Sequence, residues 1–310
     1  MKYLIIVNPI SGRGFADRAT PRIEAALCAN ELEFDLIRTE RPWHAAELAE
    51  QGAKDGYDVV VTASGDGTAN EALNGLMRAR AAGHNHTAMG IIPVGTGNDM
   101  AYGMGIRGSL EESIAVLGKR QRQKVDIGLV RGGDFPDGRY FANGVGVGFD
   151  AAVGFAAVQI RWARGLPAYL IAVIQTVFFY YQAPKVRIVL DEEVIEQSSL
   201  MISIMNGQRM GGGFYMAPDG LPGDGIFDLC IAESASKPRI FGLIPHFIKG
   251  SQATQKEIKM KHSCRVTITA QNGNHFPAHC DGETLCYAGE ELTIELIPQA
   301  LDFISDRKSA

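Results

Sequence analysis

The alternation of short apolar runs with longer amphipathic stretches in the first third of the chain constrains the fold more than any other feature. Four runs rich in branched residues are KYLIIV, FDLIR, DVVVTA and AMGIIP, at residues 2–7, 34–38, 58–63 and 88–93. Patterns typical of helices separate them, at roughly 16–30, 43–55 and 68–82. Continuous apolar strands that alternate with helices predict a parallel sheet with helices on both faces, and therefore an α/β domain.

After about residue 124 the pattern changes to strand-like runs separated by turns rich in Gly, Pro and Asp. Only residues 151–181 and 237–251 have a helical pattern there. We therefore expect a second, antiparallel and mostly β domain. The predicted domains are 1–124, on which the tail 298–310 packs, and 125–297.

The composition is that of an ordinary globular protein, since 46% of the 310 residues are hydrophobic and 21% are charged. A formal net charge of −5 gives no general attraction to nucleic acid, so we expect no nucleic-acid partner. Five irregularly spaced cysteines and the lack of a signal peptide pattern predict reduced thiols in the cytoplasm. The longest apolar run, 166–181, is shorter than the roughly 20 residues that cross a bilayer, so we expect a helix that does not span a membrane.

Three glycine-rich segments follow predicted strands of the first domain. They are NPISGRG, SGDGTANE and PVGTGND, at 8–14, 64–71 and 93–99. Loops that follow parallel strands emerge at the same edge of the sheet, and glycine lets backbone N–H groups come close to phosphate. Each loop alone is explained equally well as a tight connection, but the three together predict a phosphate-binding site. Neither the P-loop pattern nor the dinucleotide-binding pattern is present.

Within SGDGTANE the side chains suggest separate roles. The two glycines around Asp66 allow the backbone to wrap a phosphate, and Thr68 can cap the following helix and donate its hydroxyl. A carboxylate cannot contact phosphate favourably without a cation between them, so Asp66 implies Mg²⁺, directly or through water. Asn70 and Glu71 lie on the first turn of the helix, where a capping role and a site role have equal weight.

NPISGRG, SGDGTANEALNGL and GIIPVGTGNDMA together resemble the catalytic domain of the diacylglycerol kinase family, in its soluble bacterial lipid-kinase branch. Further motifs follow in family order: ANGVGVGFDA at 142–151, NGQRMGGGFYMAPDGLPGDGIFDL at 206–229 and CDGETL at 280–285. The resemblance covers nearly the whole chain. One departure is Ser64, where the family usually has Gly, although the related sphingosine kinases also have Ser there.

The resemblance implies a nucleotide-binding α/β domain like that of phosphofructokinases and NAD kinases, a C-terminal β-rich sandwich domain, and ATP in the cleft between them. It also implies a set of ATP-binding residues. They are Asn8, Pro9, Ile10, Ser11, Gly12, Thr39, Gly65, Asp66, Gly67, Thr68, Ala69, Asn70, Glu71 and Thr96. Thr39 has no signal of its own in the sequence and would otherwise be taken as a residue at the end of a strand.

LPGDGIFDL matches the metal loop of the family. The resemblance assigns the carboxylate of Asp224 and the backbone carbonyls of Leu221 and Ile226 to Mg²⁺. Oxygen ligands with few carboxylates suit a hard cation that keeps its waters. Taken alone, Asp224 followed by Gly225 is more typical of a plain hairpin turn.

CDGET resembles the catalytic segment of the family. A lipid hydroxyl that attacks the γ-phosphate must lose its proton, and either Glu283 or Asp281 can be the base. In one strand the two residues would face the same side. We assign Glu283 as the base and Asp281 to ordering the metal or water network; Asp66 completes the catalytic set. The nearby His275, His279, Cys280 and Cys286 match no common zinc spacing.

Two segments mix basic residues with aromatic ones, as a membrane-surface helix does. The first has Arg161, Arg164, Lys185 and Arg187, and the second has Lys237, Arg239 and Lys249. Helices that pack in a protein core have the same sequence pattern. We favour a core helix for the first segment, and for the second we leave open whether it is a core helix or a membrane-surface helix.

The predicted function is that of a Mg²⁺- and ATP-dependent lipid kinase of phospholipid metabolism. It would phosphorylate a lipid hydroxyl in transient contact with the inner face of the membrane, and the favoured substrate is diacylglycerol, which gives phosphatidic acid. The alternatives are a kinase of NAD, a sphingoid base or phosphatidylglycerol, and a non-catalytic nucleotide- or lipid-binding module. The second domain lacks the Thr-Pro-Thr-Gly-Ser type of segment expected of an NAD kinase, and Asp66, Asp224, Asp281 and Glu283 are all present. The oligomeric state is open, and a homodimer is compatible with the sequence.

Overall fold

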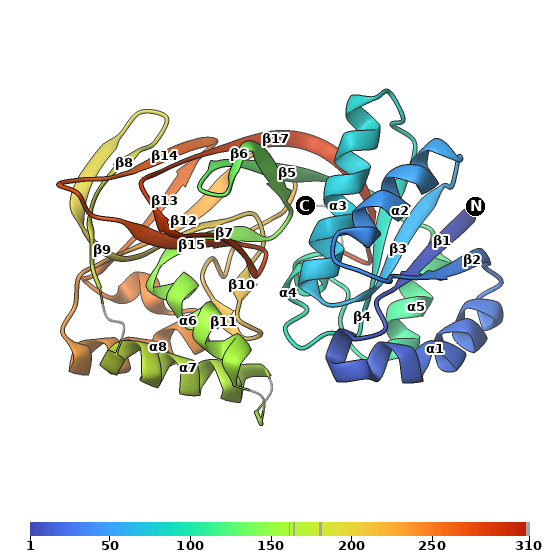
Figure 1. Ribbon diagram of the computed structural model, residues 1–310, viewed down its shortest axis with the longest axis horizontal. Helices are drawn as coiled ribbons and strands as arrows, with labels where there is room; N and C mark the ends of the chain where they lie inside the picture. Colours follow the sequence, from blue (N-terminus) through green and yellow to red (C-terminus); the bar gives the residue numbers. More distant parts are fainter. Residues whose placement is uncertain (161, 164, 180–181, 308–310) are drawn as a thin grey trace. The chain divides into compact units, whose positions relative to one another are not determined.

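The chain forms two compact units in the computed structural model, which describes residues 1–160, 162–163, 165–179 and 182–307. The first unit comprises Met1–Asp126 and the segment from Gln299, and the second comprises Ile127–Pro298. The chain passes between the units within β5 (Arg122–Gly132) and within β17 (Glu291–Ile304). A parallel α/β part followed by an antiparallel β-rich part confirms the predicted fold class (Figure 1).

The first unit is built on parallel strands in the order β2-β1-β3-β4. Their bounds are β1 Lys2–Val7, β2 Glu33–Arg38, β3 Val59–Ser64 and β4 Ala88–Pro93. All four were predicted from their apolar runs. β3 is buried along its whole length, whereas β2 is largely exposed because it lies at the edge of the sheet. The C-terminal part of β17 belongs to the first unit and pairs with β4, at Phe303 opposite Met89.

Helices cover both faces of this sheet. Their bounds are α1 Ser11–Ala29, α2 His44–Lys54, α3 Asp66–Ala81, α4 Asp99–Gly103 and α5 Leu110–Lys119. Successive residues of β1 point to opposite faces: the Tyr3 hydroxyl donates to Leu117 O of α5 at 3.1 Å, and Leu4 packs against Gly52 of α2. In Figure 1 the strands accordingly lie between two layers of helices. One layer contains α1 and α5, and the other contains α2 and α3. The apolar runs were continuous because both faces are buried.

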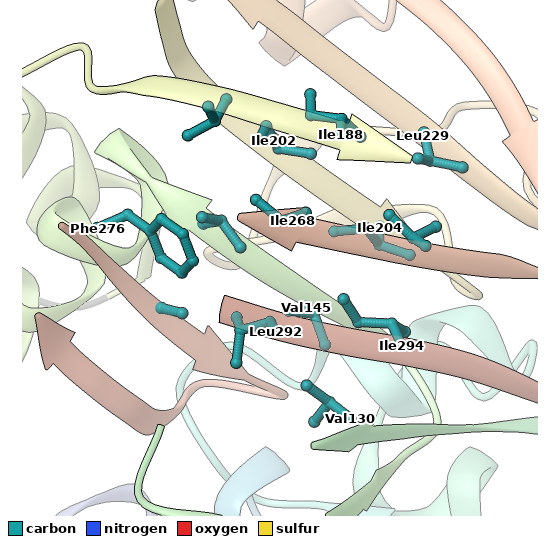
Figure 2. Packing of buried hydrophobic residues seen from close by; sticks show 14 of the residues in the cluster. Val130, Val145, Ile188, Ile202, Ile204, Leu229, Ile268, Phe276, Leu292 and Ile294 are labelled. Carbon is teal, nitrogen blue, oxygen red and sulfur yellow. The ribbon is translucent and has the colours of Figure 1, made fainter. Parts of the chain in front are cut away.

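The second unit is an antiparallel assembly with the strand path β16-β15-β7-β9-β8-β14-β17, in which β9 also pairs with β12 and β12 with β13. The remaining bounds are β6 Phe135–Phe141, β7 Gly144–Gly148, β8 Lys185–Val189, β9 Val194–Met205, β10 Arg209–Met210, β11 Phe214–Tyr215, β12 Phe227–Glu233, β13 Ile258–Ser263, β14 Arg265–Ala270, β15 Phe276–Cys280 and β16 Glu283–Gly289. Figure 2 shows how apolar side chains from these strands, Ile202, Ile268 and Phe276 among them, gather in one core. A second core lies between the sheet and helices α6 (Phe149–Gln159), α7 (Gly165–Phe179) and α8 (Lys237–Lys249).

The prediction of one continuous helix over 151–181 is wrong. α6 ends at Gln159, where Ile160 has an extended backbone, and α7 begins at Gly165. Pro167 gives the physical reason, because proline fits the first turn of a helix at no cost but disrupts a helix interior. Across the described part of the chain, no helix is both long and apolar enough to cross a bilayer.

Candidate functional site

The three glycine-rich loops of the first unit meet at the carboxyl edge of its parallel sheet, as the sequence predicted. Asn8, which follows β1, donates through Nδ2 to Thr68 Oγ1 of α3 at 2.7 Å. A Cβ atom on Gly12 would collide with the carbonyl oxygen of Val94, which follows β4. The first loop therefore touches both of the others.

The second and third loops pack backbone against backbone. A Cβ atom on Gly65 would lie 3.2 Å from the Cα atom of Gly95, and one on Gly95 would collide with Gly65. Gly65 has extended φ and ψ of −96° and −175°, so backbone conformation is not what demands glycine there. The glycine at position 65 therefore makes room for the third loop, whose backbone comes close to it at Gly95.

Asp66 begins helix α3 and bonds to the start of α4, which follows the third loop. Its Oδ1 accepts a hydrogen bond from Met100 N at 2.9 Å. The prediction that Thr68 caps the helix is wrong, because α3 begins two residues earlier with Gly65 as its N-cap. Thr68 instead lies inside the helix, where its hydroxyl accepts from Asn8 and can still donate a bond of its own.

The other predicted nucleotide-binding residues of the first unit differ in exposure. Thr39 follows β2, and its N–H donates to Val7 O at 2.9 Å, beside the first loop. Ile10 and Thr96 are exposed on their loops, whereas Ala69 and Asn70 are buried in α3. Asn74 Nδ2 donates to the backbone carbonyl of Asn70 at 2.8 Å and to its side-chain Oδ1 at 3.3 Å. The remaining members are Pro9, Ser11, Gly12, Gly67 and Glu71, all on the first loop or on the first turns of α3.

Asn98 closes the third loop and was not singled out from the sequence. It has a left-handed backbone with φ of 54°, and its side-chain amide bonds to both N and O of Gly95, at 3.0 and 3.1 Å. An Asn three residues after a Gly in a short loop is typical of such local closure.

The predicted metal loop of the second unit is a tight turn. Leu221 O accepts from Gly223 N at 2.7 Å, and Asp224 Oδ1 accepts from Ile226 N at 3.2 Å. Asp224 is exposed. Burial raises the pKa of nearby Asp228, and the negative charges of Asp224 and Asp219 raise it further, although His262 opposes them.

These residues fit a hard cation. A positive ion would offset the mutual repulsion of the three aspartates, and the turn offers carbonyl oxygens beside one exposed carboxylate. Within residues 1–160, 162–163, 165–179 and 182–307, no group of three or more His, Cys, Asp or Glu side chains is arranged to hold a metal. Binding of Mg²⁺ here would therefore depend on backbone carbonyls and water.

The expectation that Asp281 and Glu283 share a strand and face the same side is wrong. β15 ends at Cys280 and β16 begins at Glu283, which are paired across a two-residue turn of Asp281 and Gly282. Both turn residues have positive φ, 47° and 85°. An Asp-Gly pair with this conformation forms the type I′ hairpin turn. Glu283 is exposed, whereas Asp281 is only 3% exposed.

Asp281 anchors a neighbouring backbone segment. Its Oδ2 accepts from Ala142 N at 3.0 Å, and its Oδ1 accepts from Asn143 N at 3.0 Å and Gly144 N at 2.9 Å. Such bonds to a carboxylate are stronger than neutral ones. The geometry thus gives Asp281 a structural role that needs no metal.

The motifs of the second unit form one cluster of hydrogen bonds and packing contacts. Gly207 N donates to Asn143 O at 2.8 Å, and Gly220 packs against the carbonyl of Gly207. Asn143 in turn donates to Asp281. Gly207 and Asn143 therefore link the segment before the metal loop to the hairpin that carries Glu283.

The two basic and aromatic segments have one buried and one exposed face. In α7, Ala172, Val173 and Val177 are buried in the core, which confirms the core interpretation for that face, but Phe178 and Phe179 are 57% and 78% exposed. Trp162 is 79% exposed, and Arg161 and Arg164 lie outside the described residues. In α8, Arg239 bonds to Glu257 and Gln255.

Comparisons with known proteins agree along the whole chain. Residues 2–130 match the family model of the diacylglycerol kinase catalytic domain, and residues 143–305 match that of the YegS C-terminal NAD kinase beta sandwich-like domain. A protein named diacylglycerol kinase from Mycobacterium tuberculosis is 28% identical over 309 residues, which cover 99% of this chain and 96% of the relative. One from Staphylococcus saprophyticus is 26% identical over 275 residues, which cover 86% of this chain and 84% of the relative. The crystal structure of a putative diacylglycerol kinase from Bacillus anthracis has the same fold, with a TM-score of 0.77, 22% identity and coverage of 98% and 97%.

Proposed function

The chain belongs to the diacylglycerol kinase family, in the group that joins a diacylglycerol kinase catalytic domain to a YegS-like C-terminal domain, and on this premise we propose that it is an ATP-dependent lipid kinase. The favoured substrate is diacylglycerol, and the product is phosphatidic acid. The convergence of three glycine-rich loops at one edge of the first unit carries the proposal, because it gathers backbone N–H groups where phosphates bind in α/β folds.

The first unit holds the nucleotide in this proposal. The loops after β1, β3 and β4 surround the phosphates, and the bonds of Asn8 to Thr68 and of Met100 to Asp66 fix the loops before ATP arrives. Such preorganisation lowers the cost of ordering the site on binding. Asp66 is the residue that we assign to the metal end of the nucleotide.

The second unit supplies the base. The lipid hydroxyl oxygen attacks the γ-phosphorus of ATP, the bond from that phosphorus to the β–γ bridging oxygen breaks, and ADP leaves. Glu283 takes the hydroxyl proton, because it is an exposed carboxylate held at a rigid turn. Asp224, with the carbonyls of Leu221 and Ile226, would hold Mg²⁺, which when bound offsets negative charge on the phosphates.

The substrate is a membrane lipid, so the enzyme would act at the inner face of the membrane through transient contact. The exposed Trp162, Phe178 and Phe179 support this, since aromatic side chains favour the interface between lipid and water.

The test is incubation of the purified protein with Mg-ATP and a panel of acceptors. The panel contains diacylglycerol, monoacylglycerol, phosphatidylglycerol, a sphingoid base and NAD, and mass spectrometry identifies the products. We expect phosphatidic acid, and we expect Glu283→Gln to abolish its formation while ATP still binds. Phosphorylation of NAD alone, or ATP binding without any product, would overturn the proposal.

A further inference from the structure

Three residues of the second unit lie side by side in a row across its sheet. His279 of β15 pairs directly with Gly146 of β7, and Gly146 pairs with Ser203 of β9. Directly paired residues carry their side chains on the same face of a sheet. Because Gly146 has no side chain, the row leaves room between His279 and Ser203.

Asp150, on the first turn of α6, fills this room. A Cβ atom on Gly146 would collide with both Asp150 Oδ2 and His279 Nε2, so these two atoms share the space above the glycine. Ser203 Oγ donates to Asp150 Oδ2 at 2.9 Å, and Ala151 N donates to Oδ1 at 2.8 Å. The carboxyl group is therefore fixed in place next to the imidazole.

His279 connects this cluster to the hairpin turn. Gly282 N donates to His279 Nδ1 at 3.4 Å, and Gly282 directly precedes Glu283. Burial lowers the pKa of His279 to about 4, so the ring is neutral at neutral pH. A neutral ring that accepts at Nδ1 carries its proton on Nε2, the atom that faces Asp150.

We propose that His279 is a positioning residue for Glu283, which it holds through the N–H group of Gly282, and that Asp150 packs beside the ring on its Nε2 side. The proposal rests on the proposed role of Glu283 as the base. The contacts form a series: Ser203 bonds to Asp150, Asp150 lies beside His279, and His279 accepts from the turn. Displacement of a catalytic group by a fraction of an ångström slows chemistry without weakening substrate binding.

Two substitutions at one position separate the two ends of the ring. In His279→Asn, the amide oxygen stands near the place of Nδ1 and can still accept from Gly282, whereas in His279→Gln the amide stands near the place of Nε2 and leaves Gly282 without its acceptor. We expect His279→Gln to lower kcat about tenfold with an unchanged KM for ATP, and His279→Asn to recover most of that loss. His275→Asn, at an exposed histidine directly before β15, is the matched control and should behave as the wild type. Equal losses in both His279 variants, or no loss in either, would overturn the proposal.

A second measurement does not depend on activity. Hydrogen exchange of the Gly282 amide should be faster in His279→Gln than in the wild type or in His279→Asn. In the wild type, nitrogen NMR of the histidine rings should find the His279 proton on Nε2, and a proton on Nδ1 would refute the proposal even if the variants fail to fold. If the wild type phosphorylates no acceptor, the proposed function fails, and these two measurements still decide whether His279 holds the turn.

Discussion

Gly95 and Gly65 lie in contact through their backbones, and neither position has room for a side chain directed at the other. We expect Gly95→Ala to force the second and third loops of the first unit apart. The free energy of unfolding should fall by about 2 kcal/mol, as in other overpacked sites. ATP affinity should fall by at least about tenfold, since 1.4 kcal/mol corresponds to that factor. Urea denaturation and calorimetric titration with ATP measure the two effects.

Gly154→Ala is the matched control for this substitution. Gly154 lies in α6, and a Cβ atom there would meet no other atom within 4 Å. Alanine favours a helix over glycine, so this variant should be as stable as the wild type or slightly more so. An unchanged ATP affinity in Gly95→Ala would contradict the loop-on-loop packing as a requirement for binding.

Asp281 and Glu283 should respond differently to substitution. Asp281 accepts three backbone hydrogen bonds, so Asp281→Ala should lower the free energy of unfolding by about 3 kcal/mol. Asp281→Asn can keep the two bonds to Oδ1 and should lose less. Glu283→Gln changes an exposed side chain and should leave stability within about 0.5 kcal/mol while turnover is lost. A stable but inactive Asp281→Ala would instead assign Asp281 to the chemistry.

The strands of the first unit could be predicted because β1, β3 and β4 are buried on both faces and so consist of apolar residues. β13 has no apolar run in its sequence, IKMKHS, because it is an edge strand that carries charged side chains. The start of α3 was placed too late because its N-cap is Gly65, and glycine is a weak sign of a helix start next to Ser or Thr.

The site was predictable in its loops but not in its long-range contacts. The turn at Asp281 had a local sign, since Asp-Gly between strands is typical of a tight hairpin. Its partners, Ala142 to Gly144, lie nearly half the chain away in sequence, and no local pattern reveals backbone donors at that distance. Asp150 had no sign either, because its place beside His279 depends on the register of β7 with β15.

Asp224→Asn should weaken the response to Mg²⁺. The substitution removes the single carboxylate among the predicted metal ligands, so the Mg²⁺ concentration for half-maximal activity should rise about tenfold or more. Asp219→Asn is the matched control, because Asp219 is a nearby exposed acid outside the predicted ligand set. Calorimetric titration of each variant with Mg²⁺ gives a readout without catalysis. Equal effects of the two substitutions would mean that only the local negative charge matters.

Asp150 should make the stability of the protein depend on pH in a direction opposite to His279. Burial raises the pKa of Asp150 from 3.8 to about 7, so its contribution is fully present below about pH 4 and is lost as pH rises through 7. The pKa of His279 falls from 6.5 to about 4, so its contribution is present above 6.5 and is lost as pH falls through 4. Asp150→Asn removes only the first effect. Its free energy of unfolding relative to the wild type should therefore rise by about 2 kcal/mol between pH 5 and pH 8, as measured by urea denaturation. A difference that stays constant over this range would show that Asp150 does not titrate in the folded protein as its surroundings predict.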